Sequence, residues 1–151
     1  MTDRAALADL VHRYAANVDD REFDAVAELF TATAELTVPK PPVSLLPVHS
    51  HQGQAAIVKA VAAVAQTERT HHAIVGEVYR ELSETVSTGR IACVAHHFTK
   101  RADDLVDVVW HLRYDDEYAL TEGGWRISRR ALTILAIETR PVRHVLPRDP
   151  A

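Results

Sequence analysis

Three side chains of this sequence could together move a proton. Tyr14 and Asp19 lie five residues apart near the N-terminus, and His72 lies in a later apolar segment. An imidazole titrates near neutral pH, so one histidine can take a proton from carbon and return it to a leaving hydroxyl. A neighbouring carboxylate fixes the tautomer of such a ring, and a phenol can donate to a developing oxyanion. These residue types suggest acid/base catalysis in an enclosed pocket.

The sequence leaves the roles of these residues open. Asp19, at the end of a predicted helix, has the alternative role of a cap or turn residue, and Tyr14, on an apolar helix face, has that of a core residue. The charge of the His72 ring is open as well, because the Asp19 carboxylate would favour the imidazolium and burial would favour the neutral ring.

Further histidines could join the site. Adjacent strand residues point to opposite faces, so only one residue of the His71-His72 pair, and one of the His96-His97 pair, can enter a common pocket. We expect His72 and His97 to point inwards.

Nine histidines also raise the question of a metal. Together, His72, His97 and Asp19 would form a two-histidine, one-carboxylate set. The His49-x-His51 pair lies in a predicted loop and lacks the frame of a zinc finger. We favour a site without metal.

The composition restricts the class of protein. A chain of 151 residues with 47% hydrophobic content can fill one core. Its 17 basic and 21 acidic residues leave a net charge of -4, which disfavours nucleic acid and anionic membranes as partners. The sequence opens with no charged-then-apolar leader, and no apolar run approaches the roughly 20 residues that span a bilayer. We expect a soluble, cytoplasmic protein in which the single cysteine, Cys93, is a reduced, buried hydrophobe.

The first part of the chain predicts the helices that must position Tyr14 and Asp19. Apolar residues recur at spacings of three and four from Leu7 to Val18. A short helix from Phe23 to Phe30 and an alanine-rich helix from Gly53 to Gln66 follow. Glu35 to Val38 predicts a short strand, whereas four prolines between Pro39 and His51 predict an irregular loop. The apolar residues of this loop suggest a pocket lid, or a surface packed on the core or on a neighbouring subunit.

The second half of the chain alternates as a sheet does. The expected strands are His71 to Leu82, Thr88 to Arg101, Leu105 to Leu120 and Trp125 to Glu138. Their short connections imply antiparallel pairing. In the third strand one face is mainly apolar and the other mainly charged, so one sheet face should be buried. The sequence therefore predicts a single α+β domain over residues 1–140, with an extended tail at 141–151.

Several short motifs, in this order, resemble the SnoaL-like branch of the nuclear transport factor 2-like superfamily. They are residues 13–24 (RYAANVDDREFD), Leu29-Phe30, Arg69-Thr70-His71-His72 and Gly124-Trp125-Arg126-Ile127. The match covers roughly residues 5 to 138, and the order of the motifs carries most of its specificity. The resemblance implies a cone-shaped roll, in which a strongly bent sheet wraps around the N-terminal helices and encloses a hydrophobic pocket.

Within that branch the chain resembles the scytalone dehydratase and bile acid 7α-dehydratase groups, which are cofactor-independent lyases. The resemblance implies that Asp19 and His72 form a coupled pair, with the imidazole as proton shuttle. It also implies that Tyr14 donates to a substrate oxygen and that His97 is a second pocket histidine.

Other positions would contact the substrate. Val18 stands where scytalone dehydratases have a tyrosine, and Leu112 and Tyr114 lie near their serine and asparagine positions. Trp110 shares the predicted buried face of the third strand. Arg129 has the parity of the apolar residues before it and could meet a substrate anion, with a surface ion pair as its alternative role.

Three functions remain open at this point. The first is a cofactor-free lyase or isomerase, dehydratase-like, acting on a hydrophobic hydroxy-carbonyl small molecule. The second is a polyketide-type cyclase that uses Asp19 as the acid/base, and the third is a non-catalytic module that binds a small molecule. By analogy with the family, we expect a homodimer that pairs through the exposed sheet face.

Overall fold

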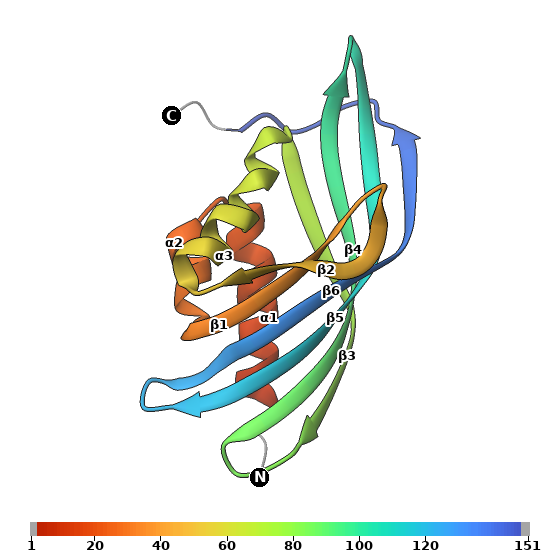
Figure 1. Cartoon of the computed structure of the whole chain (residues 1–151). Coiled ribbons are helices and arrows are strands. Elements are labelled where there is room, and N and C mark those ends of the chain that lie inside the picture. The colour runs from red at the N-terminus through yellow and green to blue at the C-terminus, as the bar shows by residue number, and fades with distance from the viewer. Residues whose placement is uncertain (1–2, 149–151) are drawn as a thin grey trace.

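The computed structural model describes residues 3–148, which form one six-stranded sheet with helices on its concave side (Figure 1). The elements are α1 (Arg4–Asp19), α2 (Phe23–Glu28), β1 (Phe30–Lys40), β2 (Ser44–Gln52), α3 (Gln54–Val61), the 3-10 helix η1 (Ala62–Gln66), β3 (Arg69–Glu81), β4 (Val86–Arg101), β5 (Asp104–Thr121) and β6 (Gly124–Pro141). Among the described residues, no helix is both long enough and apolar enough to cross a bilayer.

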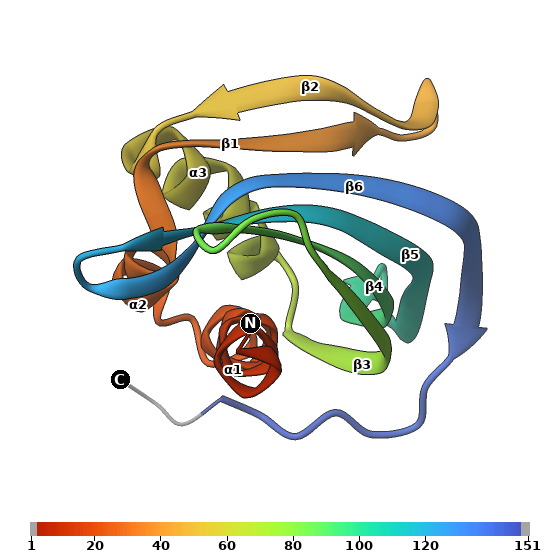
Figure 2. The same ribbon diagram turned by 90° about the horizontal axis from the view of Figure 1, so that it is seen from below.

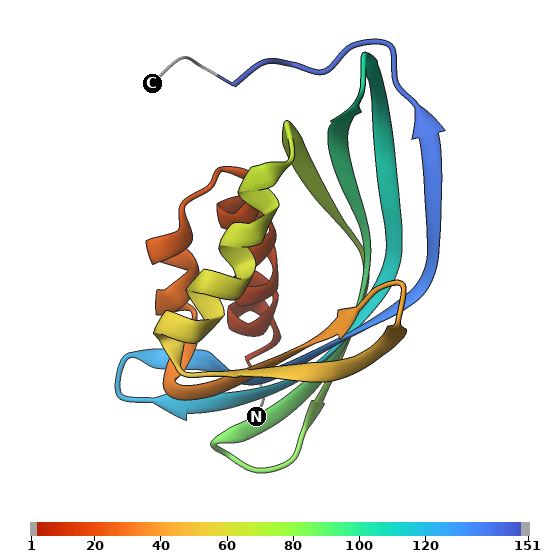
Figure 3. The ribbon, with the colours of Figure 1, turned by 45° about the horizontal axis from the view of Figure 1, so that its top comes forward.

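The sheet is bent but not closed. Its strand order is β2-β1-β6-β5-β4-β3, so β2 and β3 are the two edges. The four C-terminal strands pair antiparallel, which confirms the prediction from their short connections. Strand β1 joins β6 in parallel, a long-range pairing that the local pattern did not predict. The long strands curve around α1, and the helices lie together within the bend (Figures 2 and 3). The α+β cone expected from the sequence is confirmed.

Helix α1 carries the first two candidate residues because of where it begins and ends. The Asp3 side chain accepts from the Ala6 amide at 3.0 Å and caps the first turn. Asp19 is the last helical residue, and Arg21 then turns the chain with a φ of 62°. The apolar stripe of α1 is buried, which brings Tyr14 into the core and leaves Asp19 at the end of the helix beside β3.

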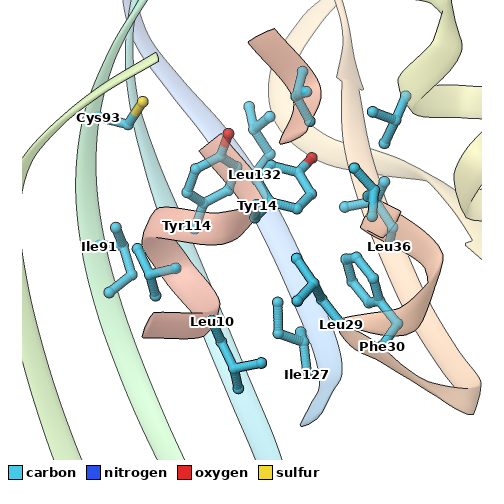
Figure 4. Packing of buried hydrophobic residues seen from close by; sticks show 14 of the residues in the cluster. Leu10, Tyr14, Leu29, Phe30, Leu36, Ile91, Cys93, Tyr114, Ile127 and Leu132 are labelled. Carbon is cyan, nitrogen blue, oxygen red and sulfur yellow. The ribbon is translucent and has the colours of Figure 1, made fainter. Parts of the chain in front are cut away.

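The core lies between α1 and the inner face of the sheet. Figure 4 shows Tyr14 and Tyr114 adjacent to each other, near Leu132 and Leu36. Cys93 is buried there, as the sequence predicted, and burial raises the pKa of its thiol to about 12.

The predicted loop from Pro39 to His51 is wrong over most of its length. Residues Ser44–Gln52 form β2, which pairs antiparallel with a β1 strand much longer than the predicted Glu35 to Val38. Proline is tolerated here because β2 is an edge strand, where a residue facing outwards needs no ladder hydrogen bond. The prolines therefore led to the prediction of a loop, although they are compatible with an edge strand.

Of the predicted tail 141–151, residues 142–148 are extended but attached to the fold, and residues 149–151 lie outside the described part of the chain. The Val142 amide donates to the Leu105 carbonyl at 3.0 Å, and the Arg69 side chain donates to the carbonyls of Leu146 and Pro147 at 3.0 and 3.2 Å. Residues 142–148 thus cross from the end of β6 to the start of β3 (Figure 1).

Candidate active site

A cavity of about 510 Å³ lies between the helices and the inner sheet face. Helices α3 and η1 supply mainly small aliphatic side chains, and the sheet supplies larger rings. The predicted site residues that line it are Tyr14, Val18, His72, His97, Trp110, Leu112 and Tyr114. Its size and apolar lining suit a small hydrophobic ligand.

Asp19 binds both the side chain and the backbone amide of His72. The His72 Nδ1 atom lies 2.7 Å from Asp19 Oδ1, and the His72 amide donates to Asp19 Oδ2 at 2.8 Å. The carboxylate therefore requires a proton on Nδ1, so the neutral form of the ring has its lone pair on Nε2. Since the His72 ring lines the cavity, Nε2 is the atom that can act as a base there.

Both oxygens of the Asp19 carboxylate accept hydrogen bonds. The Thr70 hydroxyl donates to Oδ1 at 3.0 Å, in addition to the two contacts from His72. Burial acts to raise the pKa of Asp19, but the hydrogen bonds from His72 and Thr70 outweigh it and hold the pKa below its usual value. Asp19 borders a groove between α1 and β3, behind His72 and away from the cavity lining.

Arg21 orients the Thr70 hydroxyl that donates to Asp19, a role that the sequence did not predict. Its guanidinium donates to the hydroxyls of Thr70 and Thr67 at 2.9 and 3.0 Å. Because the Thr70 oxygen accepts from Arg21, its own proton is directed to Asp19. Burial, with Arg148 nearby, lowers the pKa of Arg21 to about 10, so the side chain stays cationic at neutral pH.

His97 enters the same cavity as a neutral ring. Its Nδ1 donates to the Val108 carbonyl at 2.8 Å, which again leaves Nε2 as an acceptor. Burial lowers the pKa of His97, and the ring packs on Trp110 with centroids 4.7 Å apart. The His72 ring meets it edge-on at 6.2 Å.

The neighbouring histidines lie on the other side of the sheet. The His71 side chain is 67% exposed, and His96 pairs with Asp107 on the outer face. Among the described residues, no group of three or more histidine, cysteine or acidic side chains is arranged to hold a metal ion.

A buried ion pair lies against the Tyr14 ring, and the sequence did not predict it. Arg130 donates to Asp116 through Nε and Nη2 at 2.8 and 2.7 Å, and both side chains are fully buried. The Arg130 Cζ atom lies 4.3 Å from the Tyr14 ring centroid and 4.0 Å from that of Tyr114. Burial alone would lower the pKa of Arg130, but Asp116 outweighs burial and raises it. Burial raises the pKa of Tyr14, so its phenol stays protonated and can donate.

Arg129 does not reach the cavity, and the parity argument that placed it inside is wrong. Tyr118 pairs with Ile127 and Glu117 pairs with Arg129, so Ser128 is an extra residue in a β-bulge. The bulge shifts the alternation by one, which turns Arg129 outwards. Its side chain is 61% exposed and lies 3.9 Å from Glu35.

One signal for the buried pair was present in the sequence. Asp116 falls at the inner-face parity between Tyr114 and Tyr118, where an acid needs a cation. The bulge at Ser128 brings Arg130 to that acid, and no local pattern shows a bulge in advance.

Solved structures share this fold closely. A candidate scytalone dehydratase from Novosphingobium aromaticivorans is 21% identical, with a TM-score of 0.77 and coverage of 97% of this chain and 93% of that one. A type 3 hexachlorocyclohexane dehydrochlorinase from Novosphingobium barchaimii is 18% identical, with a TM-score of 0.77 and coverage of 96% and 94%. A protein from Kribbella flavida is 27% identical, with a TM-score of 0.76 and coverage of 90% and 93%.

No curated protein matches the chain in sequence. A family model does match, and its description is that of a SnoaL-like domain. The match extends over residues 1–131, which include α1, the dyad of Asp19 and His72, and the buried Arg130. The chain belongs to the SnoaL-like domain family.

Proposed function

We propose that the protein is a cofactor-free lyase or isomerase that acts on a hydrophobic hydroxy-carbonyl small molecule by Asp19–His72 acid/base catalysis. The observation that carries this proposal is the position of His72. Its Nδ1 is bound to Asp19 at 2.7 Å, while its ring lines an apolar cavity of about 510 Å³.

The reaction starts from a neutral His72 ring whose Nδ1 proton is bound by Asp19. The His72 Nε2 atom takes the proton from the carbon next to the substrate carbonyl, and the electron pair moves onto the carbonyl oxygen. The imidazolium that forms is stabilised by Asp19. It then returns the proton to the hydroxyl on the neighbouring carbon, which leaves as water as the double bond forms. His72 ends in its starting state, so one base serves both proton transfers.

Tyr14 and His97 assist at the two oxygens. The Tyr14 phenol, which burial keeps protonated, donates to the oxyanion that develops on the carbonyl. Such a donor contributes about 2 to 4 kcal/mol to the stability of the transition state. The His97 Nε2 atom is an acceptor and orients the hydroxyl that leaves.

The names of two structural neighbours support this reaction class. One is that of a dehydratase and the other that of a dehydrochlorinase, and both names denote elimination of a small molecule from adjacent atoms. At 21% and 18% identity the likeness concerns the fold, so the reaction is proposed from the dyad itself.

The cyclase hypothesis fits the geometry less well. It requires the Asp19 carboxylate to exchange a proton with the substrate. Both oxygens of Asp19 accept from His72, and Oδ1 also accepts from Thr70, while the residue lies behind the cavity lining. His72 is therefore the group that can face a substrate.

The test uses deuterium and a matched pair of variants. Apolar β-hydroxy ketones are incubated with the protein in heavy water, and mass spectrometry follows loss of water and uptake of deuterium next to the carbonyl. We expect turnover by the wild type and by His96→Gln, whose histidine lies on the outer face, and none by His72→Gln.

Turnover that survives in His72→Gln would overturn the mechanism. A wild type that binds apolar ketones in calorimetry but neither dehydrates nor exchanges them would identify a binding module instead.

A further inference from the structure

The cavity carries charge at one place only. Asp19 lies behind the lining, and the Arg130 cation is neutralised by Asp116 in a bidentate pair. Among the described lining residues, Lys59 is the one side chain with a formal charge at neutral pH, and none is acidic. A ligand in this cavity therefore meets one cation that it can pair with.

Two histidines lie on the wall formed by β2. His51 is paired with Leu36, and His49 is paired with Val38, across the β1–β2 ladder. Paired residues of a ladder share a face, and both partners line the cavity, so both histidines point to that side. Their rings lie 4.6 Å apart, His51 lining the cavity and His49 exposed at its outer end.

Helix α3 brings Lys59 to the same cavity. Lys59 and Ala63 are four residues apart, and both line the cavity, so they belong to one face of this helical segment. Lys59 itself is exposed, which places its ammonium at the solvent boundary. No carboxylate in the described part of the chain lies within ion-pair distance of it. We name Lys59, His51 and His49 the rim cluster.

His51 of the rim cluster and His72 of the dyad lie on opposite margins of the sheet. His51 belongs to β2 and His72 to β3, which are the two edge strands. Both residues line one cavity because the sheet bends. A ligand that spans the cavity therefore has one end at the dyad and the other at the rim cluster.

We propose that the rim cluster binds a carboxylate on the end of the substrate remote from the reacting carbons, so that the substrate is an apolar ring compound with an acidic group. Lys59 pairs with the carboxylate, and His51 donates a hydrogen bond to it. This inference rests on the proposed function, because it concerns the substrate of the same cavity, but binding tests it without any turnover.

The remote position of the anion also suits the reaction proposed for the dyad. Removal of a proton next to a carbonyl builds negative charge on the substrate. A carboxylate held at the rim is kept away from that charge, whereas one beside Tyr14 would oppose it. The rim cluster thus fixes which end of the substrate faces His72.

The test compares two ligands of nearly equal shape, 2-naphthoate and 2-naphthamide, by titration calorimetry at neutral pH. We expect the wild type to bind naphthoate about fivefold more tightly than naphthamide, a modest preference because the ion pair is partly exposed. Lys59→Gln should remove the preference and leave the affinity for naphthamide unchanged. About 1 M salt should also reduce the preference in the wild type.

The matched control is Lys100→Gln, which removes the same charge from an exposed position on β4 that does not line the cavity. It should keep the full preference for naphthoate. The proposal is overturned if wild type and Lys59→Gln prefer naphthoate equally, if Lys100→Gln loses the preference to the same degree, or if the wild type binds neither compound. Loss of turnover in His72→Gln with an intact naphthoate preference would separate the reaction from this binding site.

Discussion

Within residues 3–148, two close histidine–aspartate pairs have nearly the same geometry. The His72 Nδ1 atom lies 2.7 Å from Asp19, and the His96 Nδ1 atom lies 2.6 Å from Asp107. Each aspartate also accepts a backbone amide, from His72 in one pair and from His97 in the other. By contact distance alone, the two pairs could not be told apart.

The two histidines differ in their exposure and in their position relative to the cavity. The His72 side chain is 8% exposed and lines the cavity, whereas His96 is 24% exposed and stacks between His71 and Phe98 on the outer face. Only the inner pair has Thr70 and Arg21 behind its carboxylate. A histidine–aspartate contact alone therefore does not define an active site. The histidine must also line a cavity in which it can contact a substrate.

The largest expected effect comes from removing one carboxylate charge from each pair. Asp19→Asn should lower kcat about 1,000-fold, because the His72 imidazolium loses its counter-charge and the ring its preferred tautomer. Asp107→Asn should change kcat by less than about twofold. Steady-state kinetics on both variants, with melting temperatures to confirm folding, measure the contrast. Equal losses in the two variants would end the distinction between the pairs.

The next prediction concerns Arg21 and Thr70, which lie behind the Asp19–His72 pair and have no counterpart behind the Asp107–His96 pair. Arg21→Met should reduce kcat about tenfold with little change in KM, because the Thr70 hydroxyl loses the partner that directs its proton to Asp19. Thr70→Val should act in the same direction. A rise in KM at constant kcat would show that Arg21 contributes to ligand binding instead.

A third prediction concerns stability at acid pH. The pKa of Asp19 lies below its usual value, so the ionised carboxylate stabilises the fold at pH above the pKa of the unfolded chain. This stability is lost as the pH falls through the folded-state pKa. Urea unfolding below about pH 5 should therefore show a steeper loss for the wild type than for Asp19→Asn. Parallel curves for the two proteins would contradict the assigned hydrogen bonds.

The smallest effect distinguishes two adjacent histidines. Protonated imidazole quenches indole fluorescence, and His97 packs on Trp110. Burial lowers the pKa of His97. In a Trp125→Phe background the emission should therefore fall only when the pH drops below the usual histidine pKa of about 6.5. His97→Gln should abolish this transition and His96→Gln should retain it. If His96→Gln abolishes the transition instead, the assigned contact between His97 and Trp110 is contradicted.

Much of the fold was predictable because its signals are local. The alternation from β3 to β6 predicted four strands, and their short connections predicted antiparallel pairing. Strand β2 was missed because its proline suggested a loop, although an edge strand accepts one. The parallel contact of β1 with β6 joins segments far apart in the chain, and no local pattern encodes it.

The candidate site was predictable to the extent that strand parity holds. Parity predicted that one histidine of each adjacent pair enters the pocket, the family resemblance favoured His72 and His97, and both line the cavity. Parity failed for Arg129 because the bulge at Ser128 inserts one residue, and the same bulge hid the role of Arg130. Arg21 was missed because its partners, Thr67 and Thr70, are distant in sequence.

The open sheet separates the reaction from the choice of substrate. Strands β2 and β3 are free edges on either side of one cavity, and α3 and η1 line it as well. The β1–β2 hairpin forms part of the cavity wall, while Asp19, Thr70 and His72 are hydrogen-bonded to one another at the opposite margin. Under the proposed function, this arrangement lets one acid/base pair be combined with cavities for molecules of different size.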